Sequence, residues 1–161
     1  MTVLKEQYEW IRQTREALFA YCERINHEDY IRELENFGGW SMRKLHAHVV
    51  ACYQVWLGHF AMKSAMTIVN PDSDWTVQDM RQLFTEVDDL VFSFINTFKG
   101  KWDQELSGPV PWKEGEEALT ALWLYTHTLT HEFHHKGQLV SISRQLGYIP
   151  EDTDLIAPSH I

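Results

Sequence analysis

Four segments of the chain repeat their apolar residues every three or four positions, and this spacing constrains the fold more than any other feature. A period of 3.6 residues gathers apolar side chains on one face of a helix, whereas a strand would alternate strictly. The segments are residues 3–26, 41–66, the stretch from Thr76 to Gly100, and 116–146. With no alternating strand pattern and no internal repeat, the sequence predicts an all-α chain that folds as a four-helix bundle.

Capping and breaking residues mark the expected helix boundaries. Ser41 offers a side-chain oxygen to the free amides of the second helix, and Thr76 with Asp79 has the spacing of a capping box at the start of the third. Gly147 is expected to end the last helix. Residues 100–115 hold three Gly and two Pro, so we predict a long surface crossover without helix or strand before the last helix.

Length, composition and charge exclude several classes of protein. The 161 residues, 44% of them hydrophobic and 13% aromatic, predict a single packed domain over residues 1–161. A net charge of −9 without any run of Lys and Arg argues against nucleic acid and anionic membrane surfaces as partners. Cys22 and Cys52 form no CxxC pair, and the N-terminus lacks an apolar signal segment. We therefore expect a cytoplasmic protein without a disulfide framework or membrane span.

Most of the nine His residues lie in two short stretches. His131 and His135 are four residues apart in the last predicted helix, so their imidazoles lie about one turn apart on one face and can ligate one metal ion. His127 extends this stripe, but a straight helix does not easily bring three successive turns to one ion when Zn–N bonds are about 2.0–2.1 Å. The third ligand is expected from another helix. The second helix offers His46 and His48, which point to nearly opposite sides, and periodicity leaves the choice between them open.

The second helix resembles a signature of the DinB and YfiT-like proteins. The match is residues 40–48 (WSMRKLHAH), followed by Trp56 and Leu57. In that family the pattern runs from a Ser through an Arg and a Leu to a metal-binding His seven residues after the Ser. The resemblance therefore implies that His48 is the ligand.

The last helix and the tail resemble the same family. Residues 131–138, followed by residues 144–148, Pro150 and residues 154–156, look like a His-x-x-x-His-Arg-Gly-Gln core with its C-terminal extension. By this match the other two ligands are His131 and His135. Lys136 stands where the family usually has Arg, so the charge is kept while the bidentate fork is lost.

The resemblance implies a metal-dependent function. Three neutral imidazoles suit Zn²⁺ or Ni²⁺, with Fe²⁺ as a further candidate, and three protein ligands leave a position for water or substrate. Characterised relatives include S-transferases and an isomerase that use low-molecular-weight thiols. We therefore expect an S-transferase in which the ion activates a small-molecule thiol for attack on an electrophilic substrate. A metal-dependent hydrolase and a non-catalytic metal-binding or stress-response module are the alternatives, and a homodimer is expected.

Several neighbours of the predicted ligands are further candidates. His127 and Gln138 are placed to hydrogen-bond groups behind the ligands, and Gln138 could hold a ring N–H. Cys52, one turn after His48, is favoured as core, with a fourth ligand or a reactive thiol as alternatives. Glu132 is expected to orient a neighbour or to meet solvent, with a general base as the minor alternative.

The remaining expectations concern packing. Gly137 is expected to allow close approach of another backbone, and His134 to face a helix or a dimer partner. Trp102 and Trp112 are expected to line a mouth or an interface. Four His residues need no function: His27, His46, His59 and His160.

Overall fold

Helices dominate the computed structural model, which describes residues 2–156. The long helices are α1 (Val3–Cys22), α3 (Met42–Tyr53), α4 (Val77–Thr97) and α5 (Ala121–Gln145), and α3 continues directly into the π-helical segment η2 (Gln54–Ala61). The shorter elements are helix α2 (His27–Tyr30), the 3₁₀ turn η1 (Glu35–Phe37) and strands β1 (Glu105–Pro109) and β2 (Glu116–Thr120). The mainly helical character expected from the periodicity is confirmed.

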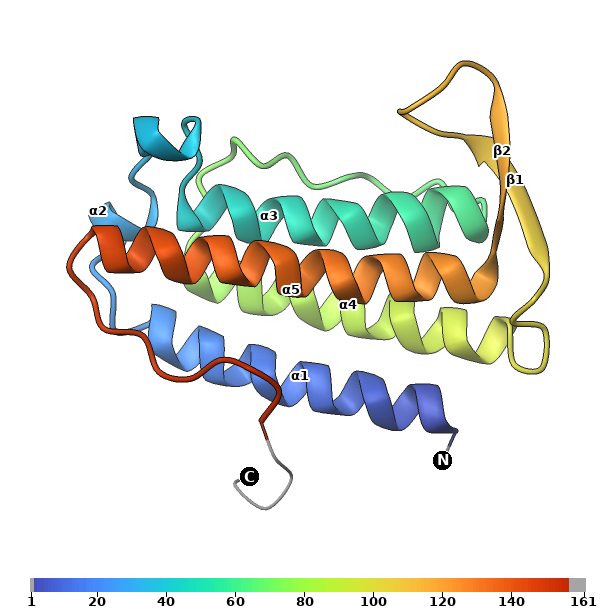
Figure 1. Cartoon of the computed structure of the whole chain (residues 1–161), viewed down its shortest axis with the longest axis horizontal. Coiled ribbons are helices and arrows are strands. Elements are labelled where there is room, and N and C mark those ends of the chain that lie inside the picture. The colour runs from blue at the N-terminus through green and yellow to red at the C-terminus, as the bar shows by residue number, and fades with distance from the viewer. Residues whose placement is uncertain (1, 157–161) are drawn as a thin grey trace.

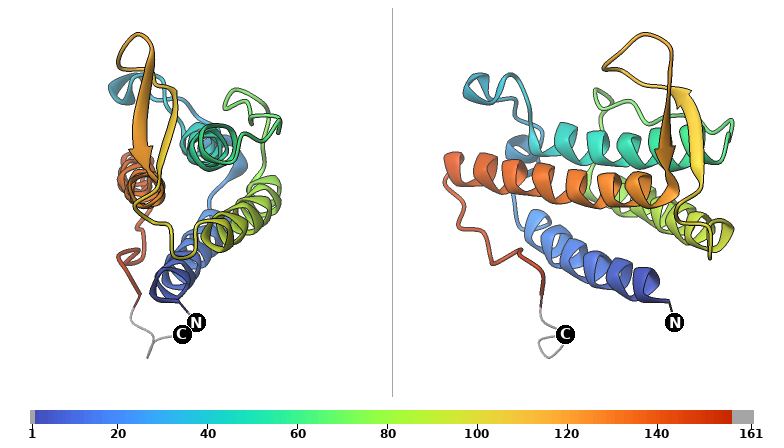
Figure 2. Two further views of the ribbon diagram at one scale, coloured as in Figure 1. Left: turned by 90° about the vertical axis from the view of Figure 1, so that its right-hand side faces the viewer. Right: turned by 45° about the vertical axis from the view of Figure 1, so that its right-hand side comes forward.

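The long helices lie side by side along the long axis of the molecule (Figure 1). Helices α3 and α5 run in opposite directions and form the most extensive contact between helices, while α4 packs against α3 and α1. Viewed end-on, α3 and α5 are neighbours on the side of the molecule away from α1 (Figure 2). The helices that carry the two His-rich stretches are therefore direct neighbours.

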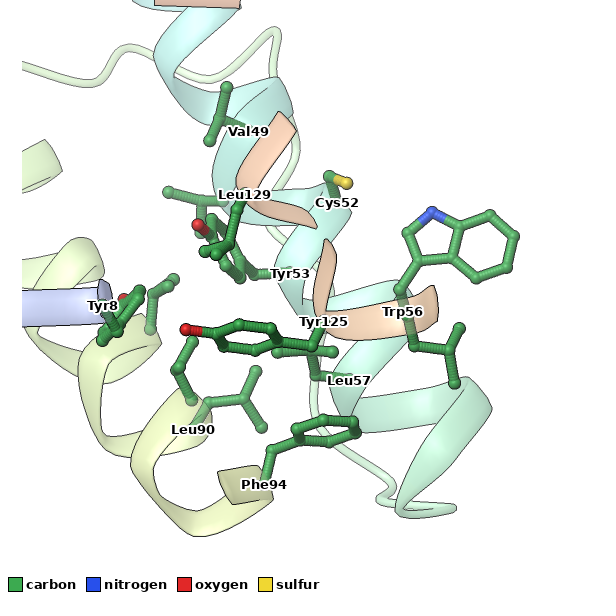
Figure 3. Packing of buried hydrophobic residues seen from close by; sticks show 14 of the residues in the cluster. Tyr8, Val49, Cys52, Tyr53, Trp56, Leu57, Leu90, Phe94, Tyr125 and Leu129 are labelled. Carbon is green, nitrogen blue, oxygen red and sulfur yellow. The ribbon is translucent and has the colours of Figure 1, made fainter. Parts of the chain in front are cut away.

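Two clusters of buried apolar side chains form the core. The larger lies between η2, α4 and the start of α5, and includes Tyr53, Leu57 and Phe94; the smaller lies at the α2 end. Figure 3 shows Cys52 and Trp56 at the edge of the larger cluster, while Tyr53 and Leu57 point into it. Complete burial of a large apolar side chain contributes about 1.5–3 kcal/mol, so the aromatic side chains account for much of the packing energy.

The predicted caps are present. Ser41 accepts a hydrogen bond from the Lys44 amide at 3.1 Å. Thr76 and Asp79 form the reciprocal capping box, with Asp79 N–H donating to the Thr76 hydroxyl at 3.1 Å and Thr76 N–H donating to the Asp79 carboxylate at 2.8 Å. These short polar side chains satisfy amides that have no partner within the helix.

Three predicted helix boundaries are wrong. The first helix ends at Cys22 rather than 26, and the Asn26 side chain caps the separate helix α2 instead. The second ends at Ala61 rather than 66, just before Lys63, whose φ of 52° breaks the helix. The last begins at Ala121 rather than 116, because residues 116–120 form β2.

The crossover before α5 was predicted to lack helix and strand, and this prediction is wrong. The segment contains an antiparallel hairpin of β1 and β2. Leu106 pairs with Leu119, and both pack against the core. Gly108 lies against the Phe60 ring, where an added Cβ would be 2.8 Å from a ring carbon. Gly and Pro in β1 resemble a loop in sequence, yet Pro109 is tolerated at the end of a strand and Gly108 allows the hairpin to pack closely on η2.

Among residues 2–156, no helix is both long enough and apolar enough to cross a bilayer.

Candidate metal centre

His48, His131 and His135 converge between α3 and α5. Their ligand atoms all lie within 4.8 Å of one another, and Nε2 of His131 is 3.0 Å from Nε2 of His48. Two nitrogens that share one tetrahedral ion at about 2.0–2.1 Å lie roughly 3.3 Å apart. The three half-buried imidazoles could therefore hold a metal ion with only small adjustments, and the donor set fits a borderline divalent ion.

The surroundings keep these imidazoles neutral. Burial lowers the pKa of His48 and also that of His135, although the hydrogen bond that His135 donates to Gln138 opposes this shift. The pKa of His131 falls to about 3, first through burial and then through the neighbouring His residues. A neutral imidazole has a lone pair to give to a metal.

Gln138 orients His135. The Gln138 amide oxygen lies 2.6 Å from Nδ1 of His135. Because an amide oxygen can only accept, Nδ1 carries the proton and Nε2 keeps the lone pair that a metal needs. The contact predicted for Gln138 is therefore confirmed.

The structure distinguishes His46 from His48. His48 faces α5, whereas the His46 ring lies in the core against Phe19 and Phe84, with Nδ1 2.8 Å from the Tyr30 hydroxyl. Burial, followed by the charge of Arg15, lowers the pKa of His46 to about 3. Of the two His residues of α3, only His48 lies within reach of His131 and His135.

Aromatic side chains flank the three imidazoles. Trp40, the first residue of the stretch that resembles the family signature, stacks on His135 and meets His48 edge-on. On the opposite side His127 lies between Trp123 and Trp56. Trp123 was not predicted from the sequence, although its position one turn before His127 in α5 is a signal.

The two tryptophans of the crossover, Trp102 and Trp112, differ in their surroundings. Trp112 is half exposed and stacks on Trp56, whose indole in turn meets His127 edge-on. Trp102 instead packs against Phe94 and Tyr125. The Trp102 indole is only partly buried at the edge of the core, and it also lines a surface pocket with Asp103 and Leu122. A place at a mouth or an interface stays a prediction for both tryptophans.

Cys52 and His127 lie beside the three His residues. Together with His131 they form a second group whose ligand atoms are within 4.8 Å of one another. Cys52 is buried, and burial raises the pKa of its thiol to about 12. At neutral pH the metal-free protein therefore holds a protonated thiol, which is a poor nucleophile.

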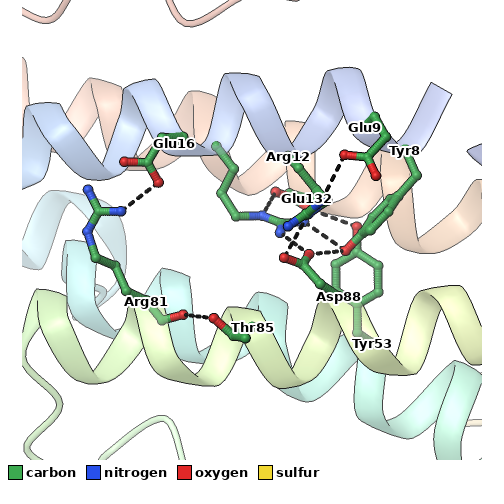
Figure 4. A network of polar contacts seen from close by, with 10 residues as sticks. Tyr8, Glu9, Arg12, Glu16, Tyr53, Arg81, Thr85, Asp88 and Glu132 are labelled. Carbon is green, nitrogen blue, oxygen red and sulfur yellow. Dashed lines mark hydrogen bonds and ion pairs between the residues drawn. The ribbon is translucent and has the colours of Figure 1, made fainter. Parts of the chain in front are cut away.

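Glu132 points away from the imidazoles into a buried ion-pair network. Its carboxylate accepts hydrogen bonds from Nε and Nη2 of Arg15 at 2.7 and 2.9 Å and from the Tyr53 hydroxyl at 2.6 Å. Asp88 joins the network through Arg15 and Tyr8 (Figure 4). Glu132 therefore holds helices together rather than meeting solvent. The burial of Arg15 could have been predicted from the sequence, because Arg15 lies on the apolar face of α1, four residues after Ile11 and three before Leu18.

Glu132 also completes a His-Glu-x-x-His pattern with His131 and His135. In metalloproteases with this pattern the Glu is the general base. Here both carboxylate oxygens are engaged by Arg15 and Tyr53 in the core, so the carboxylate is not available for that task.

Other predicted neighbours have different environments. Lys136 donates to the Thr153 carbonyl of the C-terminal tail and lies over the Phe133 ring. An added Cβ on Gly137 would meet nothing within 4 Å, so the predicted close approach of another backbone is wrong. His134 is exposed and touches His135 edge-on.

The His residues outside the site include His27 and His59, which are exposed, and His59 contacts the Met66 carbonyl oxygen through Nε2. His160 lies outside the described residues.

Comparison with known proteins identifies the family of the chain. Comparison with curated proteins gives no match. The sequence profile of the DinB family, however, matches residues 1–160. Since this match spans essentially the whole chain, including the helices that carry all three imidazoles, the protein belongs to the DinB family.

Proposed function

We propose that this protein is a metal-dependent S-transferase, a four-helix bundle in which His48, His131 and His135 hold a divalent ion and a low-molecular-weight thiol is joined to an electrophile. The observation that carries the proposal is the convergence of three neutral imidazoles from α3 and α5, with two of their nitrogens 3.0 Å apart. We propose Zn²⁺ or Ni²⁺ as the ion, with Fe²⁺ as a further candidate, because nitrogen donors suit these metals.

The ion that His48, His131 and His135 would hold would supply Lewis-acid chemistry, lowering the pKa of a thiol so that it reacts as its thiolate. The residues of the chain prepare this site. Gln138 keeps the proton of His135 on Nδ1, and Trp40 packs against His48 and His135. In the overall reaction the thiol loses its proton to solvent, its sulfur forms a bond to carbon, and the leaving group departs with the electron pair of the broken bond.

The arrangement supports S-transfer over hydrolysis. A hydrolase that activates water benefits from a carboxylate base beside the metal. Glu132 is bound to Arg15 and Tyr53, and within residues 2–156 neither group of potential metal ligands contains a carboxylate. A thiol is already largely ionised by binding to a metal, so its attack needs no such base.

The test compares His48→Ala with His134→Ala in purified, untagged protein. His134 is a matched control, because it is exposed and belongs to neither group of potential ligands. Metal content by mass spectrometry and thiol-dependent consumption of 1-chloro-2,4-dinitrobenzene should both fall in His48→Ala and be unchanged in His134→Ala. Several thiols should be compared, because a specific transferase prefers one of them.

Four results would contradict this assignment. Equal rates for all thiols, with and without metal, would exclude S-transferase activity. Metal-dependent turnover of esters or amides would support the hydrolase, and metal binding without turnover would support the non-catalytic module. A protein that neither contains nor takes up an ion would refute all three functions.

We also propose a homodimer. Apolar side chains exposed on η2, the hairpin and the start of α5 include Val55, Trp112, Leu122 and Trp123, and exposed apolar surface of this kind favours association. Sedimentation velocity over a range of protein concentrations tests this, and a monomer at every concentration would contradict it.

A further inference from the structure

The second group of potential ligands lies on the same two helices as the first group, displaced by one helical turn. Cys52 follows His48 by four residues in α3, and His127 precedes His131 by four residues in α5. Because these helices are antiparallel neighbours, both steps lead in the same direction, roughly 6 Å along the helix axes. Cys52, His127 and His131 consequently form a second set of three donors, shifted toward the hairpin, with ligand atoms within 4.8 Å of one another.

Packing restricts the motion of Cys52 and His127, the two donors that the second group does not share with the first. The His127 ring stacks on Trp123 with centroids 4.8 Å apart and planes 7° apart, and it meets Trp56 edge-on at 5.2 Å. Cys52 is only 7% exposed. Side chains fixed by packing lose little conformational freedom when they bind an ion.

We propose that Cys52, His127 and His131 form a second metal position that takes a thiophilic ion with a filled d shell, such as Cd²⁺ or Cu⁺. A thiolate with two imidazoles is a softer donor set than three imidazoles, and soft donors favour such ions. On binding, the Cys52 sulfur forms a bond to the ion and its proton passes to solvent. No oxidation or reduction is involved.

The two positions exclude one another because they share His131. A neutral imidazole has one nitrogen lone pair to give, so a thiophilic ion bound through His131 removes that ligand from His48 and His135. The second position thus makes the three-His group sensitive to thiophilic metals. Inhibition by such metals rests on the proposed function, whereas the existence of the site does not.

The experiment titrates Cd²⁺ into metal-free, untagged full-length protein and follows the ultraviolet charge-transfer absorption of a cadmium–thiolate bond. We expect saturation at one ion per chain. The absorption should be lost in Cys52→Ser and kept in Cys22→Ser, a matched control because Cys22 is also buried but lies in the other core cluster. It should also persist in His48→Ala/His135→Ala, which retains all three donors of the second position.

A second variant guards against misfolding of Cys52→Ser. His127→Gln, checked for helix content by circular dichroism, should weaken Cd²⁺ binding at least about tenfold. Exclusion is tested by loading Ni²⁺ first, since one equivalent of Cd²⁺ should displace it from the wild type but not from Cys52→Ser.

Any of four results would overturn the proposal. These are the absence of the band in the wild type, its persistence in Cys52→Ser, its loss in the His48→Ala/His135→Ala variant, and joint retention of Ni²⁺ and Cd²⁺ by one chain. None of these readouts depends on turnover, so a failure of the S-transferase assignment would be seen separately.

Discussion

Arg15→Met tests how the buried ion pairs hold the helices together. Arg15 is 5% exposed and donates to both oxygens of Glu132 and to Asp88 at 2.7–2.9 Å. The Met side chain has a similar length and is apolar, so the change removes the charge while filling much of the same space. Glu132 is then left as a buried carboxylate whose remaining donor in the network is the Tyr53 hydroxyl.

The expected loss is about 3–5 kcal/mol of the free energy of unfolding, the range for removing one partner of a buried ion pair. Three hydrogen bonds to charged groups at about 1.5–3 kcal/mol each would give a larger sum. Recovery of the large desolvation cost of the guanidinium offsets part of that sum. For a chain of this length the loss lowers Tm on the order of 10 °C.

The assay is urea unfolding followed by circular dichroism, with a chelator present because bound metal would add its own stabilisation. Arg24→Met is the control, since the Arg24–Glu151 ion pair is exposed on both sides, and it should cost no more than about 1 kcal/mol. The double variant Arg15→Met/Glu132→Met should recover at least about 1.5 kcal/mol of the loss, because it removes the unpaired carboxylate as well.

A loss below about 1 kcal/mol in Arg15→Met would refute the reasoning, because a buried Glu132 cannot lose its guanidinium at so small a cost. Additive losses in the double variant would equally show that the two side chains are not coupled.

Three further predictions follow from other sites. Gly137→Ala should raise the free energy of unfolding by about 0.5–1 kcal/mol, because an added Cβ meets nothing within 4 Å; a loss of stability in urea would contradict this. Gln138→Ala should weaken metal binding by about 10–100-fold through release of His135, and calorimetry that finds unchanged affinity would contradict that orienting role. The pKa of His46 is about 3 in the folded chain and about 6.5 in the unfolded chain. As the pH falls below about 6.5, the unfolded chain therefore takes up the proton first, and the free energy of unfolding drops by up to about 1.4 kcal/mol per pH unit. His46→Phe should reduce the slope of unfolding free energy against pH between about 6 and 4 by nearly one proton, and an unchanged slope would contradict the assignment.

Local patterns in the sequence predicted most of the helices. The third helix is the clearest case, because both its capping box and its apolar face depend on residues within a few positions of one another. The hairpin was missed because its stability depends on contacts outside the segment. Gly108 and Leu106 stabilise the strand only through their packing against Phe60 and the core.

The candidate site also has a part that local spacing predicts and a part that depends on how the helices pack. The i, i+4 spacing of His131 and His135 predicted that both would lie on one face, but spacing could not choose between His46 and His48. The resemblance to the DinB family favoured His48, and the structure gives the physical reason: α5 packs on the face of α3 that carries His48, while Tyr30 and Phe84 cover His46.

By itself, the sequence determined the mainly helical class, the helix starts at Ser41 and Thr76, and the pairing of His131 with His135, because each depends on neighbours within one or two turns. Tertiary structure alone decided that Glu132 binds Arg15 in the core and that Cys52 and His127 meet beside His131. Those contacts join residues far apart in the chain, and their formation depends on which helices pack together and at what register, which no local pattern encodes.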